Sequence, residues 1–250
     1  LFSGALLALL LAVVIFDGRS RIASVNAVLV PLFSALYILA MLFIILRNAE
    51  MFPEAVRRIF TEAFGFRAAA GGFSASLLSS ALRIGVSKGI FSSEAGMGSS
   101  PIAHAAAEGT TPYRQGLWGV AEIVIDTFIV STLTAFALLL TGHTEMDAVF
   151  RSAFGPAGSY ILLAFLAVFA FASILSWVFY ADGCIGFLFG TKKKAVSFVF
   201  RLLSVLFVFG GVFLSGEAVW AAADIFNALM IFPNLFMLFI YRKEIKYGVL

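Results

Sequence analysis

Charged residues are scarce in this sequence. Only 12% of the 250 residues are Asp, Glu, Lys or Arg, whereas 62% are hydrophobic and 29 are phenylalanine. A soluble domain carries about 25% charged residues, and the mean hydropathy here is +1.04. The composition predicts an all-α polytopic membrane protein whose surroundings are a lipid bilayer. The net charge of +3 does not indicate a nucleic-acid partner, because the basic residues fall mainly in loops between apolar segments.

Cysteine and catalytic motifs are also nearly absent. The single cysteine, Cys184, excludes an internal disulfide and a zinc cluster. The sequence has no Walker-type phosphate loop, no HExxH or CxxC motif, and no Ser/His/Asp set in one polar region. Gly96-Met97-Gly98 has only two of the glycines of a dinucleotide-binding motif, and it follows no predicted strand. We therefore expect neither an enzyme nor an organic cofactor.

The start of the chain lacks the features of a signal peptide. It begins with Leu1 rather than methionine, inside an apolar run that continues to Phe16. No basic segment precedes this run and no small-residue cleavage site follows it. We expect residues 1–250 to form a single transmembrane domain that is partial, with its N-terminal half missing.

Long apolar runs are what the sequence does contain. About 20 residues in a helix span a bilayer core of about 30 Å. Five runs are long enough for a full span: 26–46, 115–141, 159–180, 196–214 and 218–240. Residues 1–16 are interpreted as the end of another span. An amphipathic segment that begins at Pro53-Glu54 is expected to lie on the membrane surface.

The basic residues indicate an orientation. More of them fall on the side of the tail at 241–250 and of Lys192–Lys194 than on the opposite side. Because Lys and Arg concentrate on the cytoplasmic side, the C-terminus is predicted to be cytoplasmic, in a multi-pass protein of the cytoplasmic (plasma) membrane. This assignment requires the segment between 67 and 114 to cross once, from outside to inside.

One polar stretch, 88–101, interrupts the apolar sequence with three glycines, four serines, a proline, a lysine and a carboxylate. Unpaired backbone groups are costly in hydrocarbon, so the stretch is predicted to be a broken helix that lines a cavity. Unwound backbone over 91–98 would offer N–H and C=O groups to an amino-acid zwitterion. Pro101 suits the first turn of a second half-helix, predicted over 102–108. A glycine-packed helix without a ligand is the alternative.

The residues from Gly89 to Pro101 resemble the signature of the sodium:alanine (alanine or glycine:cation) symporter family. The resemblance covers nearly the whole chain, through 64–72, 104–107, 115–116, 126–127, 170–174, 180–182 and 187–190. It implies a LeuT-type fold of two inverted five-helix repeats. This chain would supply the second repeat and the end of the first. The other broken helix would lie in the missing N-terminal half.

The resemblance also implies the site. It places the substrate, a small neutral amino acid such as alanine or glycine, against seven consecutive residues: Phe91, Ser92, Ser93, Glu94, Ala95, Gly96 and Met97. It places Na⁺ against the carbonyl of Phe169, with Ala172 and Ser173. Ser93 stands where the family usually has asparagine, and Ala172 where it usually has a hydroxyl. Because Na⁺ prefers oxygen ligands, we expect a weaker site, with Ser176 one turn beyond as a further oxygen.

The implied function is symport of that amino acid with Na⁺ across the cytoplasmic membrane. Two alternatives remain open: proton-coupled transport that uses Glu94, and a truncated homologue without transport activity. Glu94 has three interpretations: a gate paired with Lys88 or Arg83, a proton carrier, or a static pair that holds the bend. Glu122 and Asp126 share a helix face and are predicted to pair with Arg83, with an ion relay as the alternative. No oligomeric state is predicted, and a monomer is compatible with the sequence.

Overall fold

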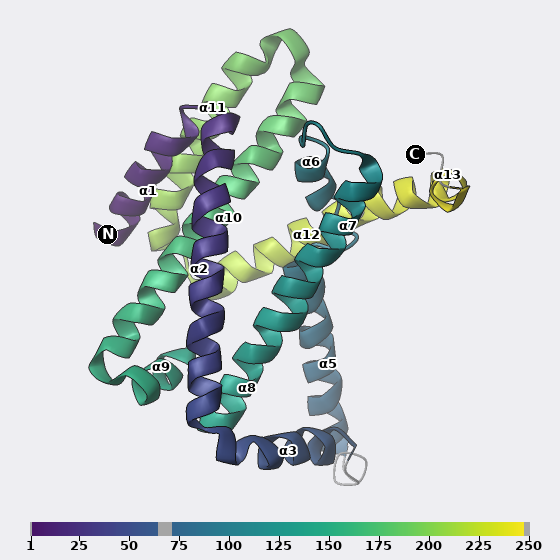
Figure 1. Ribbon diagram of the computed structural model, residues 1–250. Helices are drawn as coiled ribbons and strands as arrows, with labels where there is room; N and C mark the ends of the chain where they lie inside the picture. Colours follow the sequence, from purple (N-terminus) through teal and green to yellow (C-terminus); the bar gives the residue numbers. More distant parts are fainter. Residues whose placement is uncertain (1, 65–71, 248–250) are drawn as a thin grey trace. The chain divides into compact units, whose positions relative to one another are not determined.

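The computed structural model describes residues 2–64 and 72–247, and these are all helices and turns (Figure 1). The α-helices, in chain order, are α1 (Phe2–Ile15), α2 (Arg19–Arg47), α3 (Phe52–Phe64), α5 (Gly72–Ser93), α6 (Ser100–His104), α7 (Pro112–Ile123), α8 (Ser131–Thr141), α9 (Met146–Phe154), α10 (Gly158–Phe189), α11 (Lys193–Gly210), α12 (Gly216–Ile240) and α13 (Arg242–Tyr247). A π-helical segment, Val124–Val130, joins α7 to α8.

The prediction of five full spans is confirmed. Among the described residues, five helical stretches are long and apolar enough to cross a membrane: Arg19–Arg47, Pro112–Thr141, Met146–Lys192, Lys194–Phe213 and Gly216–Ile240. A shorter apolar helix, Gly4–Ile15, precedes them. The helices extend past the predicted ends because backbone hydrogen bonding continues into polar sequence. Arg19, for example, begins α2 well before the apolar run.

Much of the apolar surface is exposed in this chain. On α12, Phe226 is 65% exposed and Phe232 is 71% exposed. A soluble protein rarely leaves such continuous apolar surface in contact with water. Together with the five apolar helices, this surface is that of a multi-pass membrane protein.

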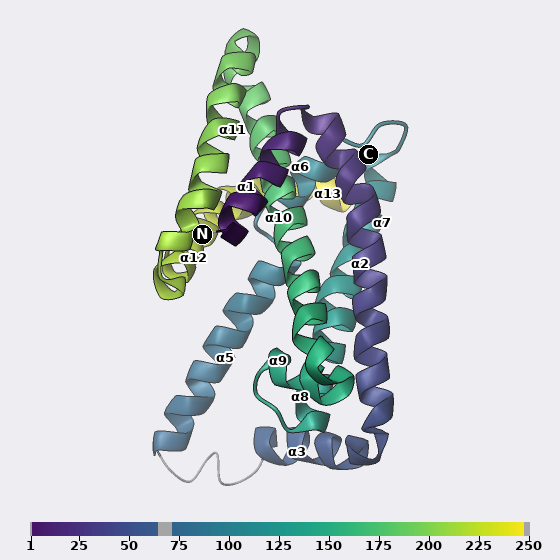
Figure 2. The ribbon, with the colours of Figure 1, turned by 90° about the vertical axis from the view of Figure 1, so that its left-hand side faces the viewer.

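The chain forms two compact units. Unit 1 comprises Leu1–Ser34, Gly96–Gln115 and Phe165–Leu250, and unit 2 comprises Ala35–Ala95 and Gly116–Ala164. In unit 1, a core of Leu11, Ile15, Ile22, Leu175 and Val178 joins α1, α2 and α10. Figures 1 and 2 show α1 lying beside α11. Gly4 of α1 lies against the side chain of Val212, so the missing Cβ permits this close approach.

A buried ion pair ties α10 to α11 in unit 1. The Arg201 guanidinium donates through Nε and Nη2 to Asp182 Oδ2, and the Asp182 side chain is only 2% exposed. Burial of both charges stabilises the helix pair only while both partners are present, because removal of one leaves the other charge buried and uncompensated.

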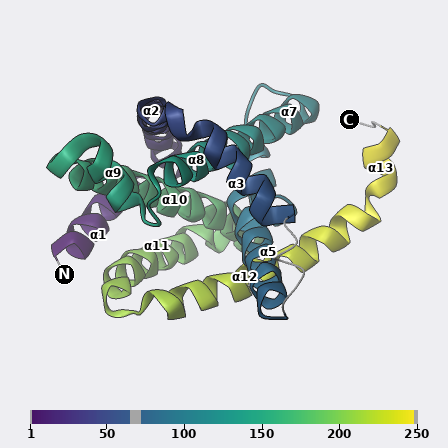
Figure 3. The same cartoon turned by 90° about the horizontal axis from the view of Figure 1, so that it is seen from below.

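Unit 2 has its own core, to which α2, α3, α8 and α9 contribute buried side chains: Met41, Ile44, Ala55, Ala137, Leu140, Val149, Phe150 and Ala153. Seen from below in Figure 3, α8 leads into α9. The turn between them begins at Gly142, whose φ of 70° ends α8 with a hydrogen bond to the Leu138 carbonyl. Phe43 stacks on Phe154 with ring centroids 5.4 Å apart.

The predicted amphipathic segment is α3. Its Phe52 ring stacks on Phe136 of α8 at 5.0 Å, and Ala55 is buried. On its polar face, hydrogen bonds from Arg57 lower the pKa of the Glu54 carboxyl. The position of α3 on the membrane surface stays a prediction.

Candidate functional site

The predicted helix break lies between α5, which ends at Ser93, and α6, which begins at Ser100. Glu94, Gly96 and Gly98 have φ angles of 51°, 80° and 86°. Glycine tolerates this left-handed region, whereas a residue with a side chain rarely adopts it. Three left-handed residues within five positions prevent the helix from continuing. The backbone of 94–99 therefore lies outside the regular helical hydrogen-bond ladder.

Two predicted boundaries of the break were wrong. Phe91, Ser92 and Ser93 are helical rather than unwound, because the first left-handed residue is Glu94. The second half-helix ends at His104, not at 108, because Ala106 N donates to the Ala103 carbonyl in a tight final turn. Pro101 lies in the first turn of α6, as predicted.

An amide on α12 holds the unwound segment in unit 1. Asn234 Nδ2 donates to the Gly96 carbonyl at 3.0 Å. A Cβ added to Gly98 would lie 3.1 Å from Cγ of Asn234, so both the space and the φ angle require glycine there. Met97 and Ser99 are buried, at 2% and 1% exposure. Asn234 is not among the predicted site residues, although an amide directly after Pro233 in an apolar span was a usable signal.

A carboxylate meets the end of α5 in unit 2. Ser92 Oγ donates to Asp126 Oδ2 at 2.9 Å, and Asp126 lies in the π-helical segment. The predicted pairing with Arg83 was wrong for Asp126, because no ion pair joins these two described side chains. π-helical turns often mark functional positions, since they redirect side chains within a helix. Here the turn accompanies a negative charge beside the last carbonyl groups of α5.

The predicted substrate residues therefore divide between the two units. Phe91, Ser92, Ser93, Glu94 and Ala95 belong to unit 2, whereas Gly96 and Met97 belong to unit 1. Glu94 is half-buried at the junction in sequence, and Ser93 Oγ accepts a hydrogen bond from Ala95 N at 3.4 Å. Residues 65–71, which carry part of the family resemblance, lie outside the described residues.

The predicted sodium residues all lie on one face of α10, at positions i, i+3 and i+4, but they differ in burial. Ala172 is buried at 4% exposure, whereas Ser173 is exposed. Phe169 stacks on Phe165 with ring centroids 6.2 Å apart. The Ala172 carbonyl already accepts hydrogen bonds from Asn26 Nδ2 and Ser176 Oγ, both at 3.1 Å. No group of three or more His, Cys, Asp or Glu side chains gathers as a metal site within 2–64 and 72–247.

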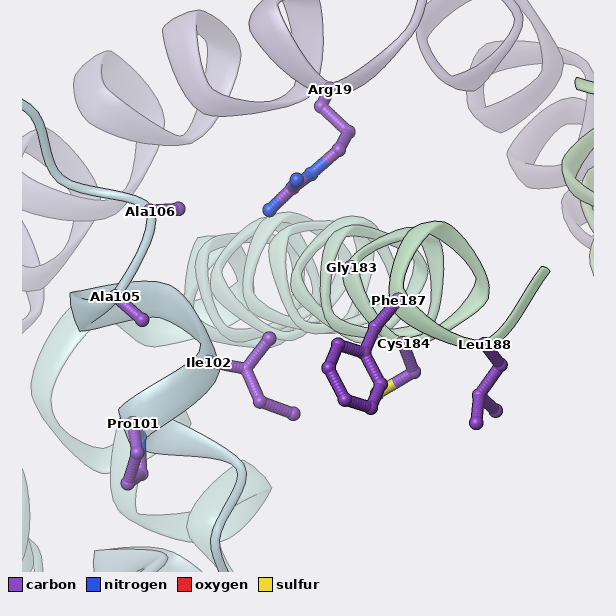
Figure 4. Close-up of a pocket in the computed structure, with 9 residues that line it drawn as sticks. All are labelled: Arg19, Pro101, Ile102, Ala105, Ala106, Gly183, Cys184, Phe187 and Leu188. Carbon is purple, nitrogen blue, oxygen red and sulfur yellow. The ribbon is translucent and has the colours of Figure 1, made fainter. Parts of the chain in front are cut away.

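Next to α6, unit 1 contains a cavity of about 560 Å³ (Figure 4). Arg19 projects from α2 toward α10 at Gly183, and Ile102 approaches α10 from α6. A Cβ on Gly183 would lie 3.1 Å from Ile102 Cγ2 and 3.6 Å from Arg19 Nη2, so glycine permits both approaches. Cζ of Arg19 lies 4.2 Å from the ring centroid of Phe179, which favours the cation in this apolar setting.

Comparison with known proteins gives a consistent result. A family model described as the sodium:alanine symporter family matches residues 1–248. An uncharacterized transporter of Haemophilus influenzae is 38% identical over 98% of this chain and 55% of its own length. The sodium/alanine symporter AgcS of Methanococcus maripaludis is 36% identical over 94% of this chain and 53% of its own. The "Probable sodium/glutamine symporter GlnT" of Bacillus subtilis is 34% identical over 97% and 51%. The chain spans about half the length of these curated relatives.

Proposed function

The chain belongs to the sodium:alanine symporter family, and from this premise we propose that the complete protein imports a small neutral amino acid together with Na⁺. Alanine or glycine is the proposed substrate. One relative is named for alanine and another for glutamine. Their names support a neutral amino acid as the substrate more strongly than they support any particular one. The cytoplasmic membrane is the proposed location.

The observation that carries the proposal is the break between α5 and α6. Polar backbone at 94–99 is held open by left-handed residues and by the Asn234 hydrogen bond to Gly96. Such a segment is tolerated within a membrane only where it is buried in protein or lines a cavity. Broken helices of this kind bind small polar substrates in transporters.

The charges near the break suit a zwitterion and a cation. The C-terminal end of α5 carries a partial negative charge from its last carbonyl groups. Asp126 adds a full negative charge where it accepts the hydrogen bond from Ser92. We assign the substrate ammonium group to this end and the substrate carboxylate to N–H groups of the unwound backbone. As the family resemblance implies, we assign Phe91 and Met97 to the limits of the side-chain pocket, with Ser93, Glu94, Ala95 and Gly96 between them in sequence.

We propose the LeuT-type fold for the complete protein, with residues 1–250 forming part of one transporter domain. In that scheme, alternating access rocks the broken-helix bundle against the rest of the fold. The Na⁺ ion is assigned to α10 near Phe169, Ala172 and Ser173. Proton coupling is the second candidate, favoured by the half-buried carboxylate of Glu94 in its left-handed conformation at the break.

Uptake into proteoliposomes separates these candidates. The complete protein is reconstituted, and accumulation of labelled alanine, glycine and glutamine is measured with a gradient of Na⁺, K⁺ or protons alone. We expect accumulation of alanine or glycine with the Na⁺ gradient only. Accumulation with the proton gradient alone supports coupling through Glu94, and its loss in Glu94→Gln then confirms that role. No accumulation under any gradient would contradict both candidates and leave the homologue without transport activity.

A further inference from the structure

Asn26 of α2 forms a polar cluster with α10 inside unit 1. Its Nδ2 donates to the Ala172 carbonyl at 3.1 Å and to Ser176 Oγ at 3.0 Å. Ser176 Oγ donates in turn to the same carbonyl at 3.1 Å. These hydrogen bonds tie two apolar helices together through groups that 146 to 150 residues of sequence separate.

The second polar atom of the Asn26 amide has no such bond. Oδ1 is buried and has no hydrogen-bond partner among the described residues. The orientation of the amide follows from its partner, because the Ala172 carbonyl only accepts and must therefore face Nδ2. Oδ1 then points away from that carbonyl. Buried polar atoms in folded proteins are nearly always satisfied, so this atom marks a place for an ordered water or an ion.

The hydrogen-bonding positions that remain open on Asn26 and Ser176 are all acceptor lone pairs. Asn26 Oδ1 keeps its lone pairs, and Ser176 Oγ keeps one after it donates to Ala172 and accepts from Asn26. The Ala172 carbonyl already accepts two hydrogen bonds, and Ser173 is exposed. Acceptor oxygens without a free donor complement a cation and disfavour an anion.

Asn26 and Ser176 line a cavity of about 200 Å³ together with Ile22, Ala23, Ala103, Phe179 and Tyr180. One water occupies about 30 Å³ of liquid, so the space admits a small ion with part of its hydration shell. No lining residue carries a charge at neutral pH. A divalent ion would require carboxylates, whereas neutral oxygens suit a monovalent ion.

We propose that Asn26 Oδ1 and Ser176 Oγ form a binding site for a monovalent cation, one helical turn beyond Ala172 on α10. The proposal rests on the proposed symport, in which Na⁺ is the ion supplied. In this proposal, the binding oxygen on α10 comes from Ser176 instead of from Ala172 and Ser173. Helix α2 also contributes an oxygen to the ion, through Asn26.

The test measures ion binding rather than transport. The complete protein is purified in detergent, and its Tm is followed as NaCl replaces choline chloride at constant ionic strength. A ligand that binds the folded state raises Tm in a saturable way. We expect Asn26→Leu and Ser176→Ala to raise the Na⁺ concentration for half-maximal stabilisation at least about tenfold, as losses around metal sites commonly do. Asn26→Asp keeps an oxygen there and is expected to retain the Na⁺ response.

The matched control is Ser204→Ala. Ser204 Oγ donates to the Phe200 carbonyl at 2.9 Å, the same local bond that Ser176 makes with Ala172, but on α11. We expect this variant to keep the wild-type Na⁺ dependence. If Asn26→Leu lowers Tm equally at every Na⁺ concentration, Asn26 only ties α2 to α10 and the cation site is wrong. If wild-type protein neither responds to Na⁺ nor transports with it, the proposed function fails as well.

Discussion

Single residues decide where the helix breaks. Glu94 is a left-handed residue with a side chain, a conformation that costs about 1 kcal/mol or more relative to a helical one. The cost is borne at the end of α5, next to the proposed site. Strain of this kind persists only where the surrounding structure enforces it. Within unit 1, Asn234 holds the carbonyl of the next left-handed residue, Gly96, through a hydrogen bond.

Asn234 is therefore predicted to be needed for the shape of the unwound segment. Asn234→Asp keeps the size of the side chain but removes the Nδ2 donor, so the Gly96 carbonyl loses this bond. We expect alanine uptake by the complete protein to fall about tenfold, the effect of losing one buried hydrogen bond. Asn227→Asp on the same helix is the control, and its uptake should match wild type. Equal losses in both variants would show that α12 does not act through Gly96.

The Ser92–Asp126 pair gives a second prediction at this scale. Asp126→Asn keeps an acceptor for Ser92 but removes the negative charge beside the end of α5. Because the charge attracts the ammonium group or Na⁺, we expect KM for alanine to rise about tenfold with a smaller change in kcat. Ser92→Ala should have a weaker effect. Glu108→Gln, in an exposed loop, serves as the control, and unchanged KM in Asp126→Asn would contradict the assignment.

At the scale of elements, the sequence predicted what neighbouring residues determine. The spans, the amphipathic helix and the position of Pro101 all follow from local composition and spacing, and the structure confirms them. The exact ends of the half-helices did not follow, because they depend on the left-handed conformation of Glu94 and on the tight turn after α6. Contacts between distant elements were missed altogether. Asn26 with α10 and Asn234 with Gly96 are such contacts, and one sequence contains no pattern that pairs them.

The pairing of α10 with α11 is predicted to depend on the buried ion pair. Arg201→Met leaves the Asp182 carboxylate buried without its partner, which typically costs about 3–5 kcal/mol. Thermal unfolding of the complete protein in detergent should therefore show a clear loss of Tm. The double variant Arg201→Met with Asp182→Leu should recover most of it. Arg151→Met breaks the exposed pair with Asp147 and should cost about 1 kcal/mol or less. Equal losses for the two single variants would contradict the role of burial.

At the scale of the whole molecule, the loop charges predict the topology. Lys194 is expected on the cytoplasmic side and Arg58 on the outside. The chain between them is predicted to cross the membrane as the broken span and as the full spans 115–141 and 159–180. Lys194→Cys and Arg58→Cys in a cysteine-free complete protein test this assignment. An impermeant thiol reagent applied to intact cells should label the cysteine at 58 and leave that at 194 unlabelled. Labelling at 194 alone would invert the orientation.

The central claim is that the break between α5 and α6 is the transport site. Gly96 has a φ of 80°, which valine cannot adopt without strain, whereas Gly89 is helical and a Cβ there would meet open space. The direct measurement is Na⁺-driven alanine accumulation by the complete protein carrying Gly96→Val or Gly89→Val, at matched membrane insertion. We predict that Gly96→Val abolishes accumulation and that Gly89→Val retains most of it. Normal accumulation by Gly96→Val would contradict the account.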